Sequence, residues 1–204
     1  MVKTAATLGR RAGRGKRLAH GRPPLPSLWF LTDPERTPDP AAIIARLPRG
    51  AGVIYRGFGA ADAPAVAARL RRLTRARGLI LLIGADPGLA AEVGADGVHL
   101  PERLMGLAGR LRWARPRWLI TAAAHGPRAL ARAGRLDLDG VLVSVVFVSR
   151  SPSAGRPMGP VRLAGLARQS RAPVIALGGI RDETAPRLIG ARVWGLAAVE
   201  GFWG

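Results

Sequence analysis

Eight short apolar segments, separated by segments with helical spacing, constrain the fold of this chain most strongly. Each segment is four to eight residues long and is bounded by Gly, Pro or Asp, which is typical of a buried parallel strand. They lie at residues 28–31, 52–55, 79–83, 97–100, 118–122, 140–147, 174–177 and 195–199. The intervening segments are rich in Ala, Arg and Leu, and prolines stand in first-turn positions near residues 63–70 and 127–132. Eight such units predict an α/β fold, a single (β/α)8 TIM barrel, with an open doubly wound sheet as the alternative.

The first 26 residues differ in composition from the rest of the chain. Residues 1–22 hold basic residues and glycines but no acidic residue and no evident apolar period. The basic residues are Lys3, Arg10, Arg11, Arg14, Lys16, Arg17 and Arg22. We therefore predict a short disordered basic N-terminal tail over residues 1–26 and one barrel domain over residues 27–204.

Charge and cysteine content limit the classes of partner. The formal net charge is +19, but no aromatic stripe or nucleic-acid motif accompanies it, so a solvated arginine-rich surface is favoured over a nucleic-acid site. The absence of cysteine excludes disulfides, thiolate metal sites and a cysteine nucleophile. No apolar run approaches the roughly 20 residues that span a bilayer. We expect a cytoplasmic protein without a membrane partner. Monomeric and homo-oligomeric states are both compatible with these features.

Residues that directly follow the strands of such a barrel form its catalytic face. Here they supply cations, hydroxyls and glycine turns, namely Arg56, Ser149, Arg150, Ser151, Gly178, Gly179, Glu200 and Gly201. Glycine lacks a Cβ, so its backbone N–H can approach an anion closely. Guanidinium groups and hydroxyls beside such turns indicate a site for phosphate or pyrophosphate rather than for an apolar ligand.

Several motifs occur in a characteristic order. Leu-Thr-Asp ends at Asp33, Arg56 follows the second predicted strand, and Gly-Ala-Asp-Gly-Val-His-Leu spans residues 94–100. Phe147 then precedes a hydroxyl-rich loop, and Val-Ile-Ala-Leu-Gly-Gly-Ile spans residues 174–180. This order, over about residues 28–202, resembles the thiamine phosphate synthases and their relatives, the TenI-like thiazole tautomerases. The heptapeptide at residues 94–100 is the most specific of these motifs.

The resemblance implies a transferase of thiamine biosynthesis that joins aminopyrimidine pyrophosphate to thiazole phosphate with Mg²⁺. In that family pyrophosphate leaves first and the thiazole nitrogen attacks the resulting pyrimidine cation, so the protein acts by electrostatic stabilisation. By position, Arg56 would face the pyrophosphate. Ser149 and Ser151, with the turns at Gly178–Gly179 and Glu200–Gly201, would face the thiazole phosphate. Arg150 or Arg156 would replace a lysine of the family pattern, which aligns with Pro152.

The main departures from the family pattern concern the residues that bind the metal ion in the family. Its Asn-Asp pair aligns with Gly84 and Ala85, and its second carboxylate aligns with Leu104. Mg²⁺ prefers oxygen ligands in octahedral geometry, so the expected metal ligands are lost and we assign none. Asp86 and Glu102, one or two positions away, are the candidates to compensate. The Gln and Lys that flank the arginine in the family align with Ile54 and Phe58.

His125 follows the fifth predicted strand, where the tautomerase relatives carry a histidine that moves a proton, and imidazole suits that chemistry. A metal-independent thiazole tautomerase-like enzyme with His125 as proton carrier is therefore the first alternative. A non-catalytic binder of phosphorylated thiazole or of thiamine phosphate is the second. We expect His99 to be a structural histidine and Asp33 to cap the following turn. We also expect the Glu200 carboxylate to point away from a bound anion.

Overall fold

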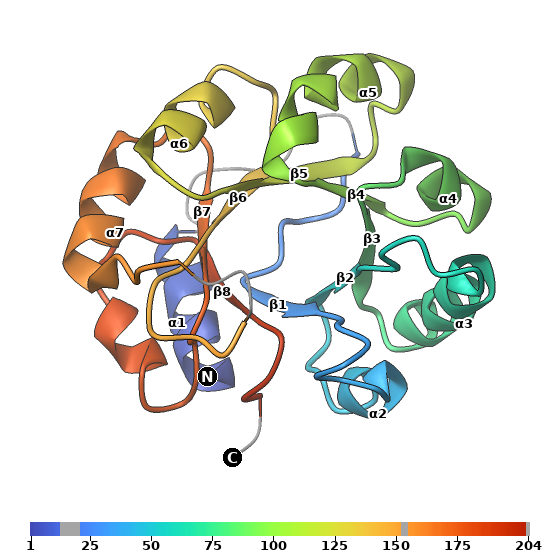
Figure 1. Cartoon of the computed structure of the whole chain (residues 1–204), viewed down its shortest axis with the longest axis horizontal. Coiled ribbons are helices and arrows are strands. Elements are labelled where there is room, and N and C mark those ends of the chain that lie inside the picture. Colours follow the sequence, from blue (N-terminus) through green and yellow to red (C-terminus); the bar gives the residue numbers. More distant parts are fainter. Residues whose placement is uncertain (13–20, 152–154, 203–204) are drawn as a thin grey trace.

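Eight parallel strands form a closed barrel in the computed structural model, which describes residues 1–12, 21–151 and 155–202 (Figure 1). Each strand pairs with its neighbours in the sequence, and β8 closes the barrel on β1. The strands are β1 (Leu28–Leu31), β2 (Gly52–Tyr55), β3 (Ile80–Gly84), β4 (Gly97–Leu100), β5 (Leu119–Ala124), β6 (Gly140–Val143), β7 (Val174–Leu177) and β8 (Gly195–Ala198). The predicted (β/α)8 barrel is confirmed, and the open sheet is excluded.

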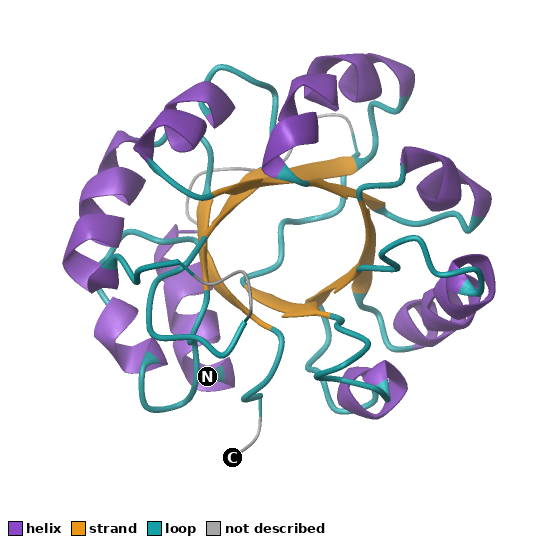
Figure 2. Cartoon of the chain, in the orientation of Figure 1, coloured by secondary structure: helices purple, strands orange, loops and turns teal. Residues whose placement is uncertain are grey.

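Helices surround the ring of strands (Figure 2). They are α1 (Val2–Ala12), α2 (Pro40–Ile44), α3 (Ala63–Ala76), α4 (Pro87–Glu92), α5 (Ala108–Ala114), α6 (Pro127–Ala133) and α7 (Gly159–Gln169), with 3₁₀ helices η1 (Glu102–Leu107) and η2 (Ala185–Leu188). Proline stands in the first turn of α2, α3, α4, α6 and α7, where no intrahelical N–H is needed. Within the described ranges, none of these helices has the length and apolarity to cross a membrane.

The inside of the barrel is packed with side chains below the carboxyl ends of the strands. Trp29 is fully buried there beside Ile54, Leu82 and Leu142. Its indole fits because Gly52, its partner on β2, has no Cβ to overlap the ring. The indole Nε1 donates to the carbonyl oxygen of Pro26 at 2.8 Å. Because these side chains fill the barrel interior, a ligand site is expected at the carboxyl-terminal end of the strands.

The expected disordered tail is wrong for residues 1–12. Val2–Ala12 is helix α1, and Met1, Ala5 and Leu8 are buried on one of its faces. The helix contacts β8, β1 and η2, and Figure 1 shows it beside β8 on the outside of the barrel. The spacing of four and three residues is an apolar helical period, which the surrounding basic residues and glycines obscured. Residues 13–20, also part of the predicted tail, lie outside the described residues.

The last part of the predicted tail, residues 21–26, is held against the amino-terminal end of the barrel. Arg22 Nη1 lies 2.6 Å from Oδ1 of Asp139, a buried carboxylate just before β6. Asp139 Oδ2 accepts from Arg112 Nη2 at 2.6 Å and from the backbone N–H of Ile120 at 2.8 Å. Burial of Leu25 adds to this attachment.

Strand β6 ends at Val143 rather than at Phe147 as predicted. The backbone N–H groups of Val146 and Phe147 donate to the carbonyl oxygens of Leu177 and Gly178, at 3.1 and 3.0 Å. The segment therefore leaves the pairing with β5 and folds across the end of β7. This places the hydroxyl-rich loop after Phe147 beside the glycine turn of β7.

Candidate active site

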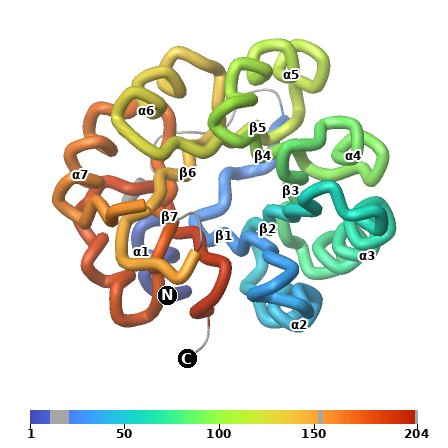
Figure 3. The backbone as a smooth tube through the Cα atoms, viewed as in Figure 1, coloured from blue at the N-terminus to red at the C-terminus, as the bar shows by residue number. Residues whose placement is uncertain are grey.

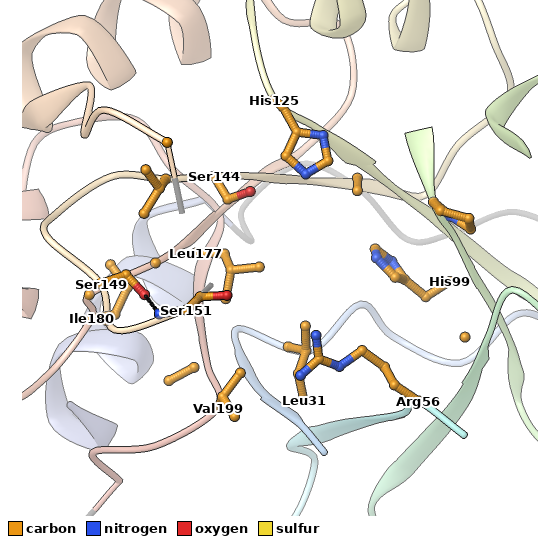
Figure 4. Close-up of a pocket in the computed structure, with 18 of the residues that line it drawn as sticks. Leu31, Arg56, His99, His125, Ser144, Ser149, Ser151, Leu177, Ile180 and Val199 are labelled. Atoms are coloured by element: carbon orange, nitrogen blue, oxygen red, sulfur yellow. Dashed lines mark hydrogen bonds between the residues drawn. The ribbon is translucent and has the colours of Figure 1, made fainter. Parts of the chain in front are cut away.

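A cavity of about 1480 Å³ opens at the carboxyl ends of the strands, and Figure 4 shows side chains from opposite walls converging on it. The backbone tube in Figure 3 shows the connections that rim this end. The structure brings every sequence-predicted site residue to this one cavity. These are Arg56, His125, Ser149, Arg150, Ser151, Gly178, Gly179, Glu200 and Gly201.

Arg56, just after β2, is fixed by groups at the end of β1. Its backbone N–H donates to Thr32 Oγ1 at 3.0 Å, and its Nε donates to the Thr32 carbonyl oxygen at 2.7 Å. Its Nη2 donates to Asp33 Oδ2 at 3.1 Å, and its Cζ lies 5.1 Å from the centre of the Phe58 ring. Burial lowers the pKa of Arg56, against the opposing effect of Asp33. The guanidinium is thus presented to the cavity in one orientation (Figure 4).

Asp33 connects two arginines that face the cavity. Its Oδ1 accepts from the backbone N–H groups of Glu35 and Arg36, as expected of a turn cap, while Oδ2 accepts from Nη2 of Arg36 at 3.0 Å. Because Oδ2 also binds Arg56, one carboxylate holds two guanidinium groups side by side. Burial raises the pKa of Asp33, but the hydrogen bonds and charges of Arg36 and Arg56 outweigh it and lower the pKa below its usual value. The sequence analysis missed Arg36, although its spacing of three residues from Asp33 is a signal for such a pair.

The opposite wall carries the hydroxyl-rich loop and the glycine turns. The backbone N–H of Ser151 donates to Ser149 Oγ at 3.3 Å, and both residues lie in Figure 4 near the end of β7. Gly178, Gly179 and Gly201 all have positive φ, at 96°, 65° and 78°. The backbone N–H groups of Gly179 and Gly201 donate to no other described residue. These amides are available to an anion.

Glu200 is among the residues that line the cavity, and its Oε1 lies 3.9 Å from Nε of Arg36. A carboxylate here is compatible with an anionic ligand because the cation beside it offsets the repulsion. The Asp33–Arg36–Glu200 chain links the ends of β1 and β8 across the barrel seam.

His125 and Glu102, which follow β5 and β4, form a pair at the mouth of the cavity. Glu102 Oε2 accepts from the backbone N–H of His125 at 2.9 Å and lies 2.8 Å from Nδ1 of its ring. Burial raises the pKa of Glu102, but these hydrogen bonds and the charge of His125 outweigh it, so the pKa is lowered. Figure 4 shows the His125 ring projecting towards the cavity. Sequence reasoning noted both residues but not their contact.

His99, on β4, is a buried histidine whose Nδ1 lies 2.9 Å from Thr121 Oγ1 on β5. Burial, with the charges of Arg56 and His125, lowers the pKa of His99 to about 3. The ring is therefore neutral at physiological pH, and His99 is among the residues that line the cavity.

The cavity wall is strongly cationic. Arg36, Arg56 and Arg103 come from the ends of β1, β2 and β4, and Arg150, Arg156, Arg162 and Arg181 come from the β6 and β7 side and α7. The lining carboxylates are Asp86 and Glu200. Such a wall favours a ligand that carries several negative charges.

Donors for a metal ion are sparse in the described part of the chain, which contains no group of three or more His, Cys, Asp or Glu placed to hold one. Asp86 Oδ1 caps α4 by accepting from the backbone N–H of Leu89 at 2.8 Å. Glu102 is engaged by His125. Leu104, at the position of the family's second carboxylate, packs against the hydrophobic core.

A family model and the similar known proteins indicate the same family for this chain. Residues 30–202 match the family model described as thiamine monophosphate synthase. The thiamine-phosphate synthase of Alcanivorax borkumensis is 32% identical over 188 residues, covering 88% of this chain and 86% of the relative. The thiamine-phosphate synthase of Methylobacillus flagellatus is 31% identical over 190 residues, covering 90% of each chain.

Among solved structures, the thiamine phosphate pyrophosphorylase from Pyrococcus furiosus superposes with a TM-score of 0.71. It is 23% identical in sequence, and the match covers 84% of each chain. At this identity the likeness shows a shared fold.

Proposed function

This chain belongs to the thiamine monophosphate synthase family, and from that premise we propose that it forms thiamine phosphate from aminopyrimidine pyrophosphate and thiazole phosphate. The observation that carries the proposal is the single cavity in which Arg56 faces the hydroxyl-rich loop and the glycine turns. It offers cations and amides for two anionic substrates that must meet.

In the proposed reaction the bond between the pyrimidine methylene carbon and the pyrophosphate oxygen breaks, and its electron pair leaves with the pyrophosphate. The lone pair of the thiazole nitrogen then forms the new carbon–nitrogen bond, which yields the thiazolium product without loss of a proton. No general base is required. The protein contributes by orienting both substrates, by stabilising the leaving anion and by limiting water around the cation.

We assign the pyrophosphate to the wall at the ends of β1, β2 and β4, where Arg56 and Arg36 are held on Asp33. The thiazole phosphate is assigned to the opposite wall. There the amides of Gly179 and Gly201 and the hydroxyls of Ser149 and Ser151 surround one part of the cavity. Arg150 and Arg156 add charge on the same side, in place of the lysine of the family pattern.

Magnesium is the ion that the family implies, and the donor set of this cavity does not fit it. Neither Ala85 nor Leu104 offers an oxygen side chain, and Asp86 and Glu102 already accept hydrogen bonds from Leu89 and His125. Mg²⁺ requires several oxygen ligands at octahedral positions. The proposed reaction therefore depends on the protein's own cations and amides.

The two alternatives gain no support from the relatives reported above, because both relatives carry the synthase name. We place the reaction in the cytoplasm, consistent with a chain that has no cysteine. Phosphorylated pyrimidine and thiazole compounds are its proposed small-molecule partners.

Rescue of a thiamine-requiring strain that lacks its own synthase tests the proposal. We expect expression of this chain to restore growth without thiamine and Arg56→Ala to abolish the rescue. Arg110→Ala, which removes an arginine from α5 outside the cavity lining, should retain the rescue. Failure of the unaltered chain to restore growth, while folded protein accumulates in the cells, would overturn the proposal.

A further inference from the structure

The positive charge of the cavity exceeds its negative charge even after internal ion pairs are counted. Arg36 and Arg56 have carboxylate partners, in Asp33 and Glu200. Within the described residues, no carboxylate lies within 4.0 Å of a guanidinium nitrogen of Arg103, Arg150 or Arg162. A cavity of this kind has unneutralised charge that a polyanion can satisfy.

Arg36 and Arg56, which both donate to Asp33, form a pair of guanidinium groups that can contact two oxygens of one anion. Both guanidinium groups share Oδ2, so one carboxylate orients two guanidinium groups side by side. Arg56 uses Nε and Nη2 in these contacts, and its Nη1 has no partner among the described residues. Only about a fifth to a quarter of each side chain is exposed, at 20% for Arg36 and 24% for Arg56. Partial burial of both groups strengthens their attraction for an anion.

Arg103 lies where the family pattern calls for metal-binding chemistry. It stands in η1 between Glu102, which binds His125, and Leu104, which packs on the core. Its side chain is exposed and lines the cavity. A positively charged side chain, that of Arg103, therefore stands one residue before the position at which the family's carboxylate would bind Mg²⁺.

We propose that Arg36, Arg56 and Arg103 bind the pyrophosphate group directly as the free anion and supply the positive charge that Mg²⁺ supplies elsewhere in the family. This inference rests on the proposed function for the identity of the substrate. Planar guanidinium groups form paired hydrogen bonds with phosphate oxygens, so these three side chains can bind a pyrophosphate without a metal. The ligand class is a pyrophosphate ester or inorganic pyrophosphate.

Titration calorimetry of the full chain with inorganic pyrophosphate, in EDTA and in excess MgCl₂, tests this inference. We expect pyrophosphate to bind in EDTA with one site per chain and Mg²⁺ to tighten binding less than about tenfold. Binding that is undetectable in EDTA and restored by Mg²⁺ would overturn the inference, as would absence of binding in both conditions.

Matched variants separate a specific site from general attraction to a basic protein. We expect Arg103→Gln to weaken binding in EDTA by about tenfold or more, because a charge-assisted contact is lost. Arg103 is exposed, so this change should leave the fold intact. Arg110→Gln, a change of equal charge on α5, should leave the affinity unchanged. Equal weakening by both variants would show that only overall charge matters and would overturn the inference.

The inference and the proposed function fail in different ways. If thiamine phosphate forms but pyrophosphate binding requires Mg²⁺, the function stands and the arginine site does not. If pyrophosphate binds in EDTA through Arg103 but no thiamine phosphate forms in either condition, the arginine site stands and the function does not.

Discussion

Glu102 holds His125 by two hydrogen bonds to one oxygen: Oε2 accepts from the backbone N–H at 2.9 Å and lies 2.8 Å from Nδ1. The lowered pKa of Glu102 means that the acceptor is a carboxylate at neutral pH. With a carboxylate as acceptor, Nδ1 is the donor of this hydrogen bond, and Nε2 is the ring nitrogen left to face the cavity mouth. This arrangement can position the ring, and it can also prepare a base.

Replacing His125 by Ala distinguishes these two uses. We expect the rate of thiamine phosphate formation to fall less than about tenfold, because the proposed reaction needs no general base and a base contributes about 10²- to 10⁴-fold. Initial rates with both substrates measure this. Glu102→Gln, which weakens the hold on the ring, should have a similar small effect. A loss of about 10²-fold or more in the His125 variant would instead support proton transfer, as in a tautomerase.

Acid should destabilise the fold through His99. In the folded protein its pKa is about 3, whereas an unperturbed histidine has a pKa of 6.5. As the pH falls from 6.5 towards 3, the unfolded chain takes up a proton that the folded protein does not. The free energy of unfolding therefore falls by up to about 1.4 kcal/mol per pH unit from this residue.

Urea denaturation of the parent and of His99→Asn across this pH range checks the expectation. Asparagine keeps a hydrogen-bonding group for Thr121 but does not titrate. The variant should therefore lose less stability on acidification than the parent does. Parallel pH profiles for the two proteins would contradict it.

Gly179 should be intolerant of a side chain. Its φ is 65°, and a Cβ there would overlap the carbonyl oxygen of Val148 in the hydroxyl-rich loop. Gly190 also has a positive φ, at 95°, but a Cβ there meets nothing within 4 Å. We expect Gly190→Ala to cost about 1–3 kcal/mol of stability from backbone strain, and Gly179→Ala to cost more. Chemical denaturation measures both, and equal losses would show that the contact with Val148 yields readily.

Leu8 tests whether helix α1 is part of the barrel. Leu8 is buried against the barrel, so Leu8→Ala should cost about 2–5 kcal/mol in the free energy of unfolding. Lys3→Ala, on the exposed side of the same helix, should have little effect. A disordered tail would give no difference between these variants in thermal or urea denaturation.

Much of the barrel was predictable because the ends of several strands coincide with residues that interrupt an apolar run. β1, β2, β4 and β7 begin and end where predicted, since each apolar run is bounded by Gly, Pro, Asp or a polar residue. β6 was predicted too long because Val145, Val146 and Phe147 continue an apolar run. Hydrogen bonding to the end of β7, which no sequence pattern records, decides where β6 stops.

The sequence predicted which residues belong to the site better than it predicted the contacts between them. Strand order alone places Arg56, Ser149 and Gly178 at one end of the barrel. The Glu102–His125 pair joins residues 23 positions apart and depends on the closed pairing of β4 with β5. Whether Arg162 faces the cavity depends on the rotation of α7, which sequence patterns do not determine. Helix α1 was not predicted because its many basic residues mask the apolar spacing of Met1, Ala5 and Leu8.

The most direct measurement is product formation by the purified chain. Incubation with aminopyrimidine pyrophosphate and thiazole phosphate, followed by oxidation of the product to fluorescent thiochrome phosphate and its separation, quantifies thiamine phosphate, and a coupled assay quantifies released pyrophosphate. We predict that both products accumulate in equal amounts and that Arg56→Ala abolishes both. Absence of thiamine phosphate from the folded chain, under conditions in which an authentic synthase produces it, would contradict the proposed function.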